Sequence, residues 1–187
     1  DLANHSGIPW TGRSGFKRVE GVRQYQRGGI AGMAFFLTQS SAPLRPSPIK
    51  RGKFIYSTLL GRNLPPPPED VTPLSVDEGD RRQSIRQMLE NHRTNRACAS
   101  CHVRFDHLGL ALQGFDTIGR QRDKDARGRV IDSKITLPSG EAANGMEGVR
   151  RYLETEKSLF ARQLCRKLVG YALGRSVLLT DQPLLDE

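Results

Sequence analysis

Apolar residues recur at helical spacing along most of this chain. Ile85, Met88, Leu89 and His92 follow the i, i+3, i+4, i+7 rule, which places them on one face of a helix. A longer helix is predicted over about residues 158–173, ended by Gly174, with two adjacent apolar rows: Phe160, Leu164, Leu168 and Ala172; Ala161, Cys165, Val169 and Leu173. This periodicity predicts a mostly α-helical protein.

Capping residues give the expected starts of further elements. Ser47-Pro48 is typical of an N-cap and first helical residue, and the helix should run to about Leu60 before Gly61 ends it. The segments 75–78 and 144–147 resemble capping boxes at the starts of two other helices. A minor β-hairpin is expected around residues 130–132.

Composition shifts divide the chain into three parts. Residues 1–27 are polar and glycine-rich, with the single Trp10, and are predicted to form an extended N-terminal arm. Residues 28–120 form the first helical domain. Within it, residues 65–68 are four prolines, which indicate a stiff polyproline strut. Residues 121–187 are expected to form the hairpin and a C-terminal helical domain that packs on the first.

Charge and hydropathy exclude several classes of protein. No stretch approaches about 18 consecutive apolar residues, so no transmembrane helix is expected. The net charge of +9 does not indicate nucleic-acid binding, because the basic residues are scattered and no aromatic platform accompanies them. A basic protein of this kind would instead attract an acidic partner. At 36% hydrophobic and 6% aromatic residues, the core is lean, and a buried porphyrin would supply missing apolar volume.

Cys98-Ala99-Ser100-Cys101-His102 is the attachment signature of a c-type haem. Two thiols at this spacing can each add to one haem vinyl group, and the histidine that follows can bind the iron. A short helix would align both cysteines, His102, Phe105 and Leu108 on one face.

Zinc would need two further ligands, and no second C-x-x-C or H-x-x-x-H is present. A thioredoxin-type pair would need a βαβ setting that the pattern does not show. The third cysteine, Cys165, is expected to be a small buried hydrophobe.

His102 is therefore the expected proximal ligand, and the sixth iron ligand decides between functions. Methionine or histidine there makes an electron carrier, whereas an open position permits peroxide or oxygen chemistry. Met33 is the preferred candidate, because a glycine-flanked stretch can hold a thioether against a flat cofactor. Met146, Met88, His92, His5, His107 or an open site remain alternatives.

Several strings, in this order and spacing, resemble the C-terminal region of the planctomycete-type multidomain cytochrome c proteins. They cover residues 19–175 and comprise Arg27-Gly28-Gly29-Ile30, Ser47-Pro48-Ile49-Lys50-Arg51-Gly52-Lys53, Leu60-Gly61, His92-Arg93, Asn95, the haem motif, Asp106, Leu108-Gly109, Ala111-Leu112, Phe115-Asp116, Ile118-Gly119-Arg120, Leu137-Pro138, Gly140 and residues 171–175. That region carries two small domains of undefined function.

The resemblance implies an exported or periplasmic haem c protein. Position 33 falls where the family often places His, Met or Gln. The chain departs from the family at Phe105 and His107, where Met and Pro are usual. Phe54 and Gln121 replace a common Trp, and Gln113 replaces Glu. Arg51, Arg93 and Arg120 match basic positions of the pattern, and one or more could pair with haem propionates. The alternative is that these arginines tie helix ends together.

The leading hypothesis is a small cytochrome c-like helical domain with one covalent haem, which passes single electrons to a redox partner outside the cytoplasm. Cys98, Cys101, Phe105 and the three arginines would contact the haem, with His102 and Met33 on the iron. One alternative is a haem subunit with peroxidase- or oxygenase-like activity at an open sixth position. Another is the haem-bearing interaction tail of a larger protein or assembly. The first residues, Asp1-Leu2-Ala3-Asn4, suggest a mature or clipped product.

Overall fold

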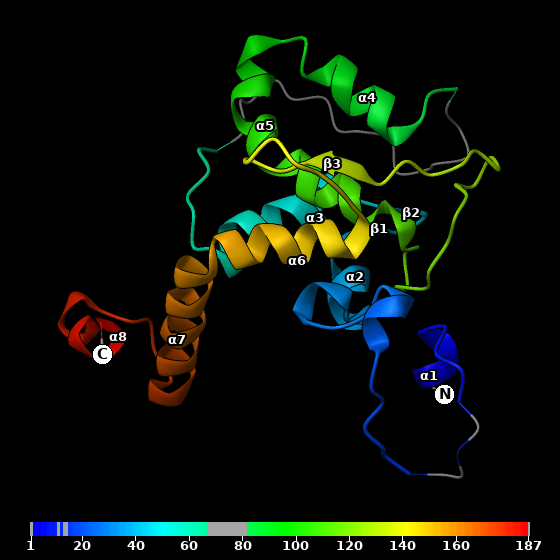
Figure 1. The fold of residues 1–187 in the computed structure, drawn as a ribbon. Coiled ribbons are helices and arrows are strands. Elements are labelled where there is room, and N and C mark those ends of the chain that lie inside the picture. Colours follow the sequence, from blue (N-terminus) through cyan, green and yellow to red (C-terminus); the bar gives the residue numbers. More distant parts are fainter. Residues whose placement is uncertain (1, 11, 13–14, 67–81, 187) are drawn as a thin grey trace.

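The computed structural model describes residues 2–10, 12, 15–66 and 82–186, and most of these residues lie in helices (Figure 1). The helices are α1 (Leu2–His5), α2 (Ala34–Gln39), α3 (Pro48–Lys53), α4 (Ile85–His92), α5 (Arg96–Ala111), α6 (Gly145–Thr155), α7 (Lys157–Leu173) and α8 (Pro183–Asp186). Short 3₁₀ turns occur at Val22–Tyr25, Ile30–Gly32, Leu112–Gly114 and Leu179–Asp181. The mostly α fold class is confirmed. The expected capping box at 75–78 and part of the proline run lie outside the described residues.

The helix expected after Ser47 is present and changes its winding midway. The Ser47 hydroxyl accepts a hydrogen bond from the Lys50 amide at 3.3 Å, and Pro48 occupies the first helical position. The chain continues as a π-helix, η3 (Phe54–Leu59), to Leu60. Gly61 then adopts φ +67°, which ends the helix as expected.

Helices α3 and α5 cross in direct backbone contact. A Cβ atom on Gly52 would collide with the carbonyl oxygen of Phe105, and one on Gly109 would collide with that of Pro48. Each helix therefore carries a glycine where the other approaches. The contact anchors the C-terminal half of α5, whose residues Leu108 and Ala111 are buried.

One hydrophobic core joins the N-terminal and C-terminal parts of the chain. It contains Ala31, Phe36, Leu37, Ile55, Leu59, Leu60, Leu108, Ala111, Leu112 and Phe115 from the first part, and Ile135, Leu137, Met146, Val149 and Tyr152 from the second. A smaller cluster of Ile85, Leu89 and Leu110 packs α4 on α5. The expected apolar face of α4 is confirmed, because Ile85, Met88 and Leu89 are all buried.

Two antiparallel pairs of short strands complete the secondary structure. Strands β1 (Ser41–Ala42) and β2 (Arg45–Pro46) form one pair, and β3 (Lys134–Thr136) and β4 (Ala142–Asn144) form the other, with Ile135 opposite Ala143. A minor hairpin is thus confirmed, but its strands lie C-terminal to residues 130–132. Val130 forms an isolated β-bridge to Lys124. In the turn between them, the Asp125 carboxylate accepts hydrogen bonds from the backbone amides of Arg127 and Arg129.

Helix α6 starts at the expected place without the expected cap. Asn144 is the N-cap residue, but its side chain makes no capping hydrogen bond. The amide of Met146 instead donates to the Gln26 side chain at 3.0 Å. The acceptor comes from 120 residues away in the sequence, which a local pattern cannot reveal.

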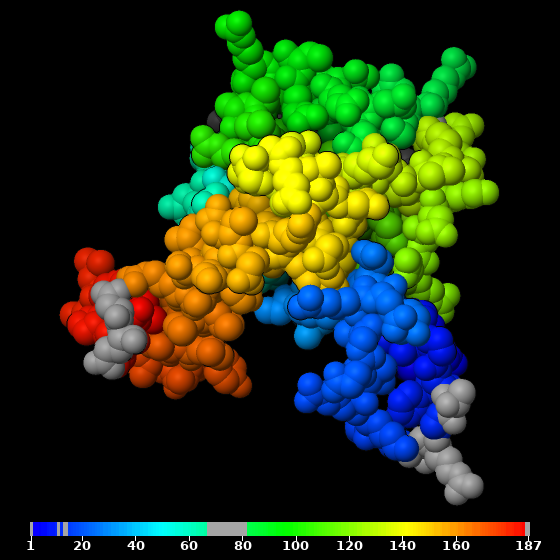
Figure 2. Space-filling view, viewed as in Figure 1, coloured from blue at the N-terminus to red at the C-terminus, as the bar shows by residue number. Residues whose placement is uncertain are grey.

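Helix α7 has the expected length and end, but not the expected burial. It closes on Gly174 at φ +63°, yet none of its residues is buried. Leu168 is 57% exposed and Tyr171 is 88% exposed. Cys165 is also exposed, so its expected burial is wrong. In Figure 2, residues 157–185 project from the body as a separate lobe.

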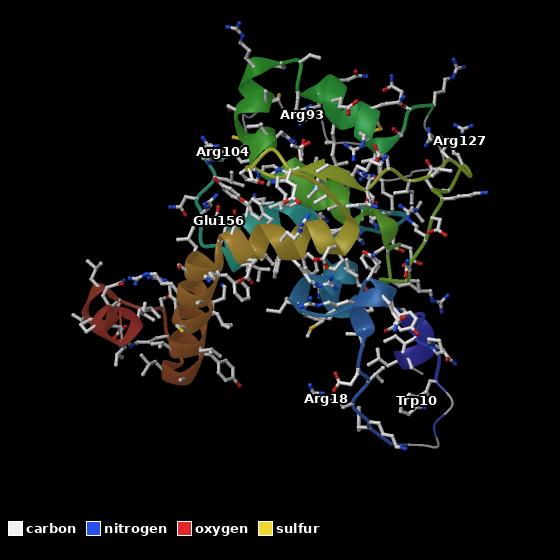
Figure 3. The ribbon with its side chains drawn as sticks, viewed as in Figure 1. Trp10, Arg18, Arg93, Arg104, Arg127 and Glu156 are labelled. Carbon is white, nitrogen blue, oxygen red and sulfur yellow. The ribbon has the colours of Figure 1, made fainter. Side chains whose placement is uncertain are left out.

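The N-terminal arm folds back onto the body. His5 Nε2 lies 2.8 Å from the carbonyl oxygen of Ile118. Arg27, which is buried, donates to the carbonyl groups of Ser6 and Gly119 at 3.2 and 2.7 Å. Trp10 packs over Gly12 within the loop of the arm (Figure 3). Across the described ranges, no helix is both long and apolar enough to cross a bilayer.

Candidate haem site

The haem-attachment motif occupies the N-terminal half of α5. The Asn95 side chain accepts a hydrogen bond from the Ala97 amide at 2.9 Å and so caps the helix. Cys98, Cys101 and His102 are all partly exposed, and both thiols are free. Because residues three and four apart share a helix face, the three side chains lie along one side of α5. The C-terminal half of the same helix is held in the core.

A hydrogen bond fixes the ring of His102. Its Nδ1 lies 2.9 Å from Oδ1 of Asp106, one helical turn later, and Asp106 is fully buried. A carboxylate can only accept a hydrogen bond, so Nδ1 is the donor in this contact and Nε2 is the ring nitrogen left to bind a metal. The Nε of Arg93 lies 4.0 Å from the second carboxylate oxygen. Figure 3 shows Arg93 between α4 and α5.

Two aromatic rings border His102. The Phe105 ring centroid lies 5.2 Å away in a tilted arrangement, and Phe105 is 4% exposed. The His92 ring, at the end of α4, meets His102 edge to face at 4.7 Å. Sequence reasoning expected Phe105 beside the motif, and the structure places it there.

The donor set fits a covalently attached haem. The chain offers two free thiols and one imidazole whose Nε2 is not engaged by Asp106, which are the groups that a c-type haem requires. A zinc site would need four protein ligands in a structural role. Within the described ranges, no three His, Cys, Asp or Glu side chains form a group that could hold a metal ion alone. Haem iron does not need such a group, since the porphyrin supplies four of its ligands.

The preferred sixth ligand, Met33, is not brought to the motif. Met33 is the residue before α2 and is 55% exposed. Figure 1 places α2 on the other side of α3 and α6 from the first turns of α5. Met146 is also unsuitable, because it is 1% exposed and fills the main core beside Gly32. Of the sixth-ligand candidates, His92 is the one with a ring contact to His102. Met88 is buried on α4.

The three candidate arginines have different environments. Arg51 is fully buried, and its two terminal nitrogens donate to the Leu112, Phe115, Leu37 and Asp116 carbonyls and to the Ser41 hydroxyl at 2.7–3.2 Å. These bonds tie helix ends together, so the expected contact of Arg51 with a propionate is not supported. Arg120 is exposed, and its amide donates to Asp116 Oδ1 at 2.7 Å. Arg93 alone of the three lies beside the motif.

Sequence reasoning did not assign Asp106 a role in the site. The available signal was its spacing from His102, because residues i and i+4 meet on a helix surface. His107, a further sixth-ligand candidate, is half-buried on the same helix as His102. Burial lowers the pKa of His107, whose ring packs edge-on against Tyr152 at 5.4 Å. It faces the main core and not the cysteines.

Comparison with known proteins places the chain in a family. Residues 27–125 match the family model described as "Protein of unknown function (DUF1588)", and residues 139–187 match the one described as "Protein of unknown function (DUF1585)". No curated protein and no solved structure matches the chain. Both family domains occur in planctomycete-type cytochrome c proteins. Because the DUF1588 model matches more than half of the chain, the chain belongs to the DUF1588 family. It carries a DUF1585 domain after that match.

Proposed function

We propose that this chain is an exported monohaem c-type cytochrome that transfers single electrons. The observation that carries the proposal is the arrangement of Cys98, Cys101 and His102 on one partly exposed side of α5, with His102 Nδ1 held by Asp106. Haem bound there would supply a one-electron redox couple. Covalent attachment of haem takes place outside the cytoplasm, which is the reason for proposing an exported protein.

Each residue of the motif has a distinct task. The Cys98 and Cys101 thiols would each add across a vinyl group, forming a carbon–sulfur bond while the thiol hydrogen passes to the other vinyl carbon. No oxidant is consumed in this addition. His102 would bind the iron through Nε2, because its Nδ1 proton is engaged. The buried ring of Phe105 would shield the imidazole from water on one side.

Covalent attachment can be tested directly. The chain, expressed with an export signal and a c-type haem maturation system, should gain the mass of one haem that survives denaturation. Cys98→Ala and Cys101→Ala should each leave a single thioether link, seen as a shifted α-band of the pyridine haemochrome. Cys165→Ala is the matched control, because Cys165 is exposed on α7 and should not alter attachment. Wild-type protein without covalent haem would refute the proposal.

The spectrum of the same protein separates the carrier from the alternative with an open sixth position. A low-spin ferric haem that cyanide and carbon monoxide leave unchanged supports an electron carrier. A high-spin haem that binds both readily would instead support peroxidase- or oxygenase-like chemistry. His92→Ala tests the one candidate that touches His102. The His92 ring lies against His102 at 4.7 Å, which leaves no space for a porphyrin between the two rings, so the low-spin signal should persist in this variant. Its loss would identify His92 as the sixth ligand and would mean that the two rings move apart when haem binds.

The exposed face of α7 favours a second role, in docking to another protein. This 17-residue helix contains Lys157, Arg162, Arg166 and Lys167 and no acidic residue, and its leucines stay partly exposed. A partner with an apolar groove bordered by acidic side chains would complement such a surface. This supports the hypothesis that the chain is the haem-bearing part of a larger assembly, and mass analysis of the native particle tests it.

A further inference from the structure

We propose that Asp106 is a positioning residue that lowers the reduction potential of the haem iron through its hydrogen bond with His102. The inference rests on the proposed function and deepens it, because it concerns how the protein tunes the redox centre. Neither the family resemblance nor the haem motif assigns this task to Asp106.

The geometry singles out Asp106 among the carboxylates of the chain. It is fully buried, and its Oδ1 lies 2.9 Å from His102 Nδ1. A buried carboxylate is costly unless it is paired and hydrogen-bonded. Its second oxygen is also buried and has no hydrogen-bond partner in the described structure. The hydrogen bond of Asp106 that the structure shows is thus directed at the expected iron ligand.

The helix itself explains why a side chain takes this role. In the middle of α5, the carbonyl groups of the preceding turn accept main-chain hydrogen bonds, so the His102 ring needs another acceptor. A residue at i+4 on the same helix is in reach of the imidazole. Aspartate at position 106 fills that place with a full negative charge. A backbone carbonyl would offer only a partial one.

The charge has a predictable effect on the metal. A carboxylate that accepts the Nδ1 proton increases the basicity of the imidazole. A more basic ligand donates more charge to the iron and favours the ferric state over the ferrous state. Hydrogen bonding around the axial ligand is one of the means by which proteins set haem potentials. Asp106 should therefore lower the midpoint potential.

Arg93 opposes this effect from the other side of the carboxylate. Its Nε lies 4.0 Å from Asp106 Oδ2, and its side chain is 31% exposed. A guanidinium at this distance offsets part of the negative charge that the carboxylate presents to His102. Removing Arg93 should consequently shift the potential in the direction opposite to removing the charge of Asp106.

Redox titration of the haem-loaded protein tests the inference. Asp106→Asn keeps the shape of the side chain and removes its charge. It should raise the midpoint potential by an amount that corresponds to about a tenfold change in the ferrous-to-ferric ratio, or about 59 mV for one electron. Asp125→Asn is the control, since it removes an equal charge from a carboxylate that bonds Arg129 in a surface turn. It should leave the potential nearly unchanged.

A second variant keeps the inference testable if Asp106→Asn does not fold. Arg93→Gln should lower the potential, because the carboxylate then acts on His102 without a compensating cation. A shift in Asp106→Asn no larger than in Asp125→Asn, or a raised potential in Arg93→Gln, would overturn the inference while leaving the proposed function intact. Wild-type protein that carries no covalent haem would overturn both.

Discussion

Arg51 shows how a residue can match a family pattern for a structural reason. Its position suggested a contact with an anionic cofactor group, but its guanidinium is fully buried and bonds four carbonyl groups and one hydroxyl. Three of those carbonyls belong to the turn that follows α5 and one to the end of α2. Arg51 therefore holds the C-terminal end of α5, the helix that contains the C-x-x-C-H motif, in the core.

This role predicts a large loss of stability without a redox effect. Arg51→Met would remove the hydrogen bonds of a fully buried guanidinium and take from the Phe115 carbonyl the donor that Arg51 supplies, so the free energy of unfolding should fall by about 1–3 kcal/mol or more. Denaturant unfolding measures the loss. Arg104→Met is the control, because Arg104 is exposed on the same helix and should change stability by less than about 0.5 kcal/mol. A stable Arg51→Met protein with an altered haem potential would instead support a propionate contact.

At the scale of elements, the crossing of α3 and α5 determines where the haem motif lies. Gly52 and Gly109 let the two backbones touch, and the contact falls in the C-terminal half of α5. The N-terminal half, with Cys98 and His102, extends beyond this crossing and remains partly exposed. One helix thus provides both a rigid anchor and an accessible attachment surface.

The crossing predicts that even one methyl group is harmful there. In Gly109→Ala, the new Cβ would collide with the Pro48 carbonyl, so the helices must move apart, at a cost of about 1–3 kcal/mol or more. Thermal unfolding measures the loss. Gly114→Ala is the matched control, because the nearest atoms to its added Cβ lie 3.8 Å away. Equal stability of the two variants would contradict the close contact.

At the scale of the whole molecule, burial is unevenly distributed. The core joins α2, α3, α5 and α6, whereas α7 has no buried residue and extends from the body with α8 (Figures 1 and 2). An ion pair between Arg175 and Asp181, with nitrogen and oxygen 2.7 Å apart, helps to join α7 to the turn before α8. The Arg175 guanidinium lowers the pKa of Asp181 to about 2, so this ion pair persists in mildly acidic solution.

Uneven burial predicts uneven protection of the backbone. Local opening free energy rises with the number of buried apolar contacts around a segment. In hydrogen exchange of the isolated chain, amides of residues 164–173 should exchange at least about tenfold faster than those of residues 106–111. If α7 docks on a partner in the native assembly, its amides should become protected there. Protection of α7 equal to that of α5 in the isolated chain would contradict the uneven burial.

Much of the architecture follows from local sequence patterns. Periodicity and capping residues reveal features that depend on residues close together in the sequence. These features are the capped helix at Pro48, the apolar face of α4, the extent of α7 and the helix that contains the C-x-x-C-H motif. The attachment motif is local as well. Its three side chains share a helix face because their spacing along the chain places them there.

Only the tertiary structure decided what lies around that motif. Four features depend on residues that are far apart in sequence or lie on separate helices. They are the Gln26 cap on α6, the bonds of Arg51 to the turn after α5, the separation of α2 from the motif, and the contact of His92 with His102. The spacing of apolar residues predicts which face of a helix is apolar, but it does not predict which other element covers that face. For this reason the sequence by itself determined that Cys98, Cys101 and His102 share one helix face. Packing decided that Asp106 is buried behind them and that the apolar face of α7 is left uncovered.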